Sequence, residues 1–139
     1  NVIPDTVELR GTIRTLTQQN LKLAEEKIQS IPVSVAAAFE AVAEVTYHSN
    51  YPPTVNSPEQ TEFAASVAAS VAGTCGEAQI TMGGEDFSYM LEERPGAYIF
   101  MGNGDSADVH HPKYNFNDEA IPVGCSWWAG IVEQRMPAE

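Results

Sequence analysis

The chain has 139 residues, of which 43% are hydrophobic, and a formal net charge of −12 at pH 7. This length allows one ordinary domain or two small ones. The negative charge argues against a nucleic-acid partner, because binding to phosphates needs clustered Lys and Arg. No apolar run approaches the length of a membrane span, so we also expect no membrane partner.

The start of the sequence and its cysteines indicate a piece of a longer cytoplasmic protein. There is no initiator Met and no signal segment, and Asn1 leads straight into a strand-like pattern. Cys75 and Cys125 lie far apart, without a Cys-x-x-Cys spacing. We therefore expect two ordinary thiols, buried or half-buried, in a reducing cytosol rather than a disulfide framework.

The first fifty residues are predicted to form a strand, a helix and a second strand. Residues 6–15 alternate between apolar and polar side chains, and so do residues 43–48. Between them, Thr17 is placed to cap a helix with apolar residues at helical spacing. Pro32 interrupts this helical pattern, so we expect a break or a kink there.

The rest of the chain is predicted to alternate helices with strands. Residues 50–54, which include two prolines, mark the boundary. Ser57, Pro58 and Gln60 favour the start of a helix that Gly73 ends. The remaining elements are expected as strands at 78–82 and 97–101 and as helices at 86–93 and 121–135. This order predicts an α/β fold.

Two polar loops follow the predicted strands of this second part. Gly83-Gly84 comes after the first of these strands, and the loop 102–112 comes after the second. Ligands of α/β sheets bind beyond the carboxyl ends of the strands, where both loops would lie. Together with the carboxylates that open the next helix, the loops indicate the rim of a metal-hydrolase cleft.

His110 is the candidate metal ligand in the second loop. A neutral imidazole is a common ligand, and Pro112 would hold the loop still. The alternative is a surface histidine in a polar loop. His111 points away from its neighbour in any extended conformation, so we assign it to the rim. Asp105 and Asp108 are interpreted as turn-forming residues, although either could reach a metal.

Two further positions offer groups that bind anions. Gly83-Gly84 presents backbone N–H groups at a helix N-terminus, where a carboxylate or oxyanion can bind. The alternative is that the acidic residues after the glycines only cap that helix. Arg14, on the polar face of the first predicted strand, can clamp a substrate carboxylate through two parallel bonds. Its alternative is a cross-strand ion pair with Glu44.

These residues stand in motifs that resemble bacterial N-acyl-amino-acid amidohydrolases, which are related to co-catalytic metallopeptidases. Residues 1–14 read NVIP and then GTIR, residues 82–88 read MGGEDFS, and residues 109–118 read VHHPKYNFND. They resemble the family's NVIP…GTIR stretch, its EDFS turn and its closing LHxP…FND signature. The family includes hippurate hydrolase, auxin-conjugate hydrolases and, more distantly, carboxypeptidase G and succinyl-diaminopimelate desuccinylase.

The resemblance implies a catalytic domain with two metal ions that carries an inserted lid domain, through which the enzyme forms a homodimer. Residues 1–50 would then be a partial lid and dimerisation domain, built on an α+β sheet. Residues 51–139 would be the C-terminal part of a di-metal, aminopeptidase-like α/β catalytic domain.

The resemblance also implies roles for individual residues. The histidine of the closing motif, here His110, binds one of two divalent ions; zinc is expected, with manganese, nickel or cobalt as alternatives. Asn1 and Arg14 contact the substrate carboxylate or the scissile carbonyl, and Gly83 and Gly84 lie beside the substrate. Gly84 departs from the Ser or Ala that is common there. The general base and the remaining ligands lie upstream, so no catalytic residue is expected within this chain.

The implied activity is hydrolysis of the amide bond of a hippurate-like N-acyl amino acid by a metal-activated water. With one strong ligand, the chain by itself is expected to be inactive. The alternative is a noncatalytic dimerisation or binding module.

Overall fold

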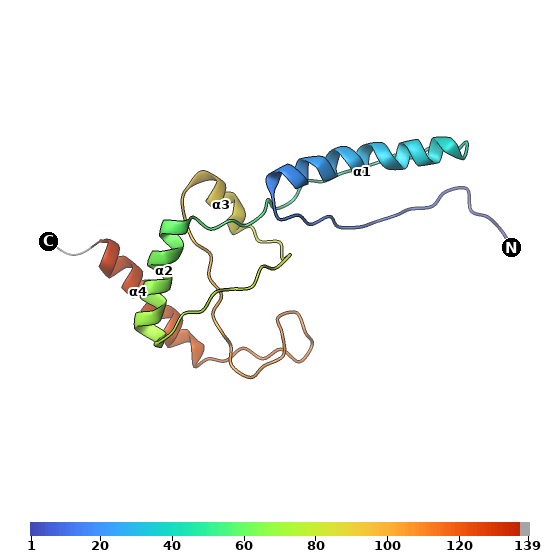
Figure 1. Cartoon of the computed structure of the whole chain (residues 1–139). Helices are drawn as coiled ribbons and strands as arrows, with labels where there is room; N and C mark the ends of the chain where they lie inside the picture. Colours follow the sequence, from blue (N-terminus) through green and yellow to red (C-terminus); the bar gives the residue numbers. More distant parts are fainter. Residues whose placement is uncertain (137–139) are drawn as a thin grey trace. The chain divides into compact units, whose positions relative to one another are not determined.

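The computed structural model describes residues 1–136, and over this range it contains four helices and no β-strand (Figure 1). The prediction of an α/β fold is therefore wrong for this chain. The helices are α1 (Gln18–Ala38), α2 (Pro58–Ala72), α3 (Phe87–Glu93) and α4 (Ala120–Arg135). None of the helices within residues 1–136 is long and apolar enough to cross a membrane.

The four runs predicted as strands are drawn as coil because no ladder of backbone hydrogen bonds forms among residues 1–136. Alternating polarity reports which side chains face a core, but a strand exists only where a neighbouring strand supplies its hydrogen-bond partners. The apolar side chains of these segments are instead exposed. Leu9 is 92% exposed, Val42 91% and Ile80 83%.

The chain divides into two compact units. The first consists of Asn1–Pro53 and Met82–Ser88, and the second of Thr54–Thr81 and Tyr89–Glu139. The first unit thus contains the whole predicted lid segment and also the Gly83-Gly84 turn. The predicted assignment of residues 1–50 to a lid and 51–139 to a catalytic domain stays a prediction.

Helix α1 of the first unit begins where the sequence indicates. The Thr17 hydroxyl accepts a hydrogen bond from the backbone N–H of Asn20 at 3.1 Å, which satisfies one of the free N–H groups of the first turn. The helix then continues through Pro32 to Ala38, so the predicted break is wrong. Proline removes a single backbone hydrogen bond, and the intact turns on both sides sustain the helix.

One face of α1 forms an open depression together with a side chain from the preceding segment. The depression has a volume of about 260 Å³ and is apolar. It is lined by Ile13, Ala24, Lys27, Ile28, Ile31 and Pro32. The apolar stripe predicted for this helix is therefore real, although Ile31 remains 54% exposed.

The second unit is built on the contact between α2 and α4. Helix α2 ends at Gly73, whose φ of +78° is the left-handed conformation predicted for this glycine. Ala64 and Val67 of α2 are buried, and the indole N–H of Trp127 in α4 donates a hydrogen bond to the Ala64 carbonyl at 3.1 Å. Trp127 thus faces α2, whereas Trp128, which the sequence also places on a core-facing stripe of α4, is 64% exposed.

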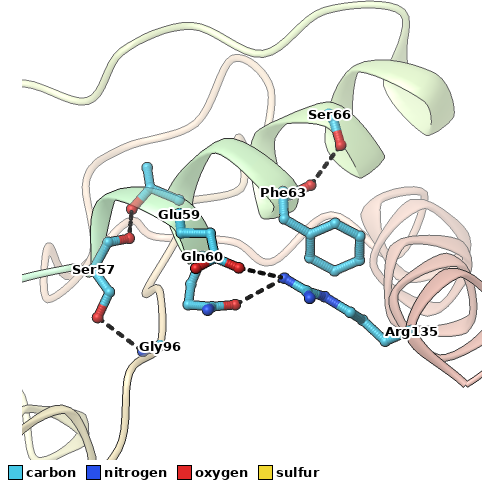
Figure 2. A network of polar contacts seen from close by, with 8 residues as sticks. Ser57, Glu59, Gln60, Phe63, Ser66, Gly96 and Arg135 are labelled. Atoms are coloured by element: carbon cyan, nitrogen blue, oxygen red, sulfur yellow. Dashed lines mark hydrogen bonds and ion pairs between the residues drawn. The ribbon is translucent and has the colours of Figure 1, made fainter.

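A polar network joins the N-terminal end of α2 to the C-terminal end of α4 (Figure 2). The Arg135 guanidinium donates to Gln60 Oε1 at 3.0 Å, lies 3.9 Å from the Glu59 carboxylate and stacks 4.1 Å from the centroid of the Phe63 ring. The predicted capping box is not formed, because Ser57 Oγ accepts instead from the Gly96 N–H at 3.2 Å. Arg135 thereby holds α4 to the first turns of α2.

We expect Gly130→Ala to destabilise the pairing of α2 with α4. A Cβ at Gly130 would lie 2.9 Å from Cγ1 of Val67, a fully buried side chain that has no room to retreat. Overpacking of this kind costs about 1–3 kcal/mol, against about 1 kcal/mol that alanine gains over glycine in a helix. Thermal unfolding followed by Trp127 fluorescence measures the effect. The control is Gly124→Ala in the same helix, which meets only the flexible end of Met101 at 3.4 Å. Equal midpoints for both variants would contradict the expectation.

Candidate functional site

The first unit brings together two of the predicted binding elements, Arg14 and the Gly83-Gly84 turn. Arg14 Nη1 donates a hydrogen bond to the Met82 carbonyl at 2.9 Å. A Cβ built on Gly84 would lie 3.4 Å from the same nitrogen. Within residues 1–136 no carboxylate lies within ion-pair distance of Arg14, so the alternative of a pair with Glu44 is not formed. A guanidinium has five N–H donors, so the bond to Met82 leaves donors that could bind an anion.

Tyr51 belongs to the same cluster and was missed by the sequence analysis. Its ring carbon Cδ2 lies 3.2 Å from the position of a Cβ on Gly84. Residues 50–54 were interpreted only as a boundary, and the proline pair at 52–53 was the sole signal that Tyr51 is held in place. A side chain at position 84 would therefore require Tyr51 and Arg14 to move back from the turn by a few tenths of an ångström.

The acidic residue that follows the glycines acts as a helix cap. Glu85 Oε1 accepts a hydrogen bond from the backbone N–H of Phe87 at 3.2 Å, and the Glu85 carbonyl accepts one from Ser88 Oγ at 2.5 Å. Ser88 is fully buried and anchors this turn. The capping alternative considered for these residues thus holds for Glu85.

Asn1 is exposed, and the structure gives it no hydrogen bond or ion pair with any of residues 1–136. Its predicted contact with the substrate stays a prediction. The structure therefore places Arg14, Gly83 and Gly84 in one cluster but does not add Asn1 to it.

His110 lies in the second unit, at an exposed turn of the loop between Met101 and α4. Its φ is +70°, a left-handed conformation that non-glycine residues rarely adopt. The residue is exposed, and the structure gives its imidazole no hydrogen bond or ion pair with residues 1–136. An imidazole in this state has a nitrogen lone pair free to bind a metal ion.

His111 is used by the loop itself. Its ring atom Nδ1 accepts a hydrogen bond from the backbone N–H of Lys113 at 3.1 Å. The backbone N–H of His111 donates to the Asp108 carbonyl at 3.0 Å. In the neutral ring the proton therefore resides on Nε2, which cannot then bind a metal. The assignment of His110 as a metal ligand stays a prediction.

The described residues do not form a complete metal site. Within 1–136 no group of three or more His, Cys, Asp or Glu side chains could hold a metal ion. Cys75 and Cys125 are free thiols, but both are exposed, so the expectation that they would be buried or half-buried is wrong. The donor chemistry of His110 fits a divalent ion, but this chain offers one ligand where a protein site needs three or four.

Comparison with known proteins places these features in a family. The profile of Peptidase family M20/M25/M40 matches residues 4–134. An N-acetyldiaminopimelate deacetylase of Bacillus subtilis is 37% identical over 87% of this chain and 33% of its own length. An N-acetylcysteine deacetylase of the same organism is 30% identical over 94% of this chain and 34% of its length. Thermostable carboxypeptidase 1 of Saccharolobus solfataricus is 32% identical over 89% of this chain and 33% of its own length.

A solved structure has the same fold over most of this chain. The YXEP protein of Bacillus subtilis, a dinuclear metal binding peptidase from the M20 family, aligns with a TM-score of 0.78 at 24% sequence identity. The alignment covers 90% of this chain and 35% of that one. The chain therefore spans about a third of the length of the relatives that it matches.

Proposed function

The chain belongs to peptidase family M20/M25/M40, and from this premise we propose that it is part of a longer metal-dependent amidohydrolase. That enzyme cleaves the amide bond of N-acyl amino acids, including hippurate-like substrates, with a water molecule activated by two divalent metal ions. Zinc is the ion that we propose first. Three relatives with deacetylase or carboxypeptidase names support this class of reaction. The description of the YXEP protein as a dinuclear metal binding peptidase supports a reaction that depends on metal ions.

The observation that carries the proposal is the availability of His110. Its imidazole has no partner within residues 1–136, while the neighbouring His111 is held by backbone groups. Such a ring can serve as one ligand, and the other ligands and the general base come from the part of the enzyme outside this chain. The metal ions, when bound, lower the pKa of the attacking water and polarise the carbonyl.

The cluster around Arg14 supplies recognition of the substrate in this proposal. The guanidinium bonds to the Met82 carbonyl beside the Gly83-Gly84 turn, and it presents a planar fork of N–H donors. A carboxylate on the amino-acid half of the substrate is the anion that suits this fork.

We expect the isolated 139-residue chain to be inactive toward N-acyl amino acids and to bind zinc weakly. A single imidazole cannot hold a catalytic ion, because the affinity of protein sites comes from several preorganised ligands. Hydrolysis of a panel of N-acetyl and N-benzoyl amino acids, together with zinc titration by calorimetry, tests this expectation. Turnover by the isolated chain that a chelator abolishes would contradict it.

The second candidate function is a noncatalytic dimerisation or binding module. The absence of a three-ligand group within residues 1–136 favours it. Zinc content and turnover of the longer protein separate the two candidates, since only the enzyme needs both.

We further propose that the longer enzyme is a cytoplasmic homodimer that associates through residues 1–50. Support comes from the apolar side chains that this segment leaves exposed, among them Val7 at 76% and Leu9 at 92%. Light scattering of the longer enzyme and of a Leu9→Glu variant tests the association. An unchanged dimer in the variant would contradict it.

A further inference from the structure

We propose that Asn103 is a positioning residue for His110: its side-chain amide ties together the two ends of the loop that presents the imidazole. The inference rests on the proposed function, because it gives His110 the role of a metal ligand. It adds a residue that touches neither metal nor substrate but fixes where the ligand stands.

The amide of Asn103 uses both of its polar atoms across the loop. Its Nδ2 donates to the Asn115 carbonyl at 2.8 Å, and its Oδ1 accepts from the backbone N–H of Asn117 at 2.8 Å. The two contacts join residue 103 to chain segments 12 and 14 residues away. A half-buried side chain thus closes a loop whose tip, around His110, is exposed.

The other side-chain contacts at the base of the loop are longer or more local. Ser106 Oγ lies 3.3 Å from the same Asn115 carbonyl, but its one hydroxyl proton has a nearer acceptor in the Ala107 carbonyl at 3.0 Å. The Asn117 side chain accepts from the N–H of Glu119 at 3.0 Å, directly before α4. Because α4 packs on α2, Asn103 connects the loop to the most firmly packed part of the second unit.

The tip needs such a constraint because its backbone is strained. A left-handed conformation at a non-glycine residue such as His110 costs on the order of 1 kcal/mol or more and persists only where the surroundings enforce it. One local bond closes the turn that contains His110, from the backbone N–H of His111 to the Asp108 carbonyl. A second bond, from the backbone N–H of Tyr114 to the His111 carbonyl, closes the next turn. Neither bond sets the distance between the two ends of the loop, which is the part that Asn103 controls.

The chemistry requires a side chain that donates and accepts at once. Asn103→Asp retains the acceptor for the Asn117 N–H but loses the donor to the Asn115 carbonyl, and Asn103→Ala loses both. The effect of the two substitutions should therefore be graded. Asn115→Ala is a matched control, because only the backbone carbonyl of Asn115 takes part in the closure.

The test uses the longer holoenzyme that contains this chain. Zinc affinity is measured by competition with a chelator, and ligand geometry by the visible spectrum of the cobalt-substituted form. We expect Asn103→Ala to weaken zinc binding by about 10- to 100-fold, as residues that orient a ligand do. The cobalt bands should shift, Asn103→Asp should lie between Asn103→Ala and the parent, and Asn115→Ala should match the parent.

The outcomes separate this inference from the proposed function. Unchanged zinc affinity and cobalt spectrum in Asn103→Ala, with loss of zinc in His110→Ala, would overturn the inference and leave the proposed function standing. Unchanged zinc in both variants would overturn both. If Asn103→Ala fails to fold, Asn103→Asp decides: a shifted cobalt spectrum at an unchanged unfolding temperature supports positioning, and an unshifted one refutes it.

Discussion

In the longer enzyme, replacing His110 by alanine is expected to lower zinc affinity by more than about 100-fold and to reduce kcat/KM at least as strongly. The physical reason is the loss of a ligand itself, whereas residues that only orient a ligand already contribute 10- to 100-fold. The imidazole has no partner within residues 1–136, so its removal leaves no buried polar group unpaired in this chain. Zinc per subunit after dialysis against a chelator measures the effect.

The matched control for this prediction is His111→Ala. The two histidines are adjacent in one loop, but the ring of His111 accepts a hydrogen bond from Lys113. We therefore expect His111→Ala to retain zinc and to lose at most a small part of the loop's rigidity. A variant pair in which His111→Ala loses zinc and His110→Ala keeps it would reverse the assignment of the ligand.

The second large effect is expected for Arg14→Ala. Loss of the guanidinium should reduce kcat/KM for an N-acyl amino acid by about 100-fold, which corresponds to about 2.7 kcal/mol. The analogue with a carboxamide in place of the carboxylate should be affected far less. The measurement is the ratio of kcat/KM for the two substrates, which should fall toward one in the variant.

Arg10 and a lysine replacement supply the controls for Arg14. Arg10 stands four residues earlier and forms only an exposed ion pair with Glu8 at 2.8 Å, so Arg10→Ala should leave the ratio unchanged. Arg14→Lys keeps the charge but not the planar fork, and we expect it to restore part of the discrimination. If Arg14→Ala preserves the preference for the carboxylate, Arg14 does not read that group.

The features that were predicted well depend on near neighbours in the sequence. Thr17 caps α1 because its hydroxyl reaches an N–H three residues ahead, and Gly73 ends α2 because it adopts a left-handed conformation cheaply. The burial stripe of α2 follows from residues spaced by one helical turn. The role of His110 as a metal ligand stays a prediction.

The prediction of strands failed for the opposite reason. The alternation at residues 6–15 is local, but a strand forms only through hydrogen bonds to a second segment that the pattern does not identify. Within residues 1–136 no such partner is engaged, and side chains such as Leu9 remain exposed. The break predicted at Pro32 failed for a similar reason. The prediction counted the one backbone hydrogen bond that proline removes but not the intact helical turns on both sides of it.

The candidate site shows the same division between local and long-range information. The sequence by itself determined the residue types of the site: an imidazole before a proline, a glycine pair before a short helix and an arginine in the GTIR stretch. Only the tertiary structure decided that Arg14 bonds to Met82, that Tyr51 packs at Gly84 and that Asn103 closes the loop of His110. These contacts join residues up to 68 positions apart, and such pairings follow from how the chain packs rather than from any periodicity along it.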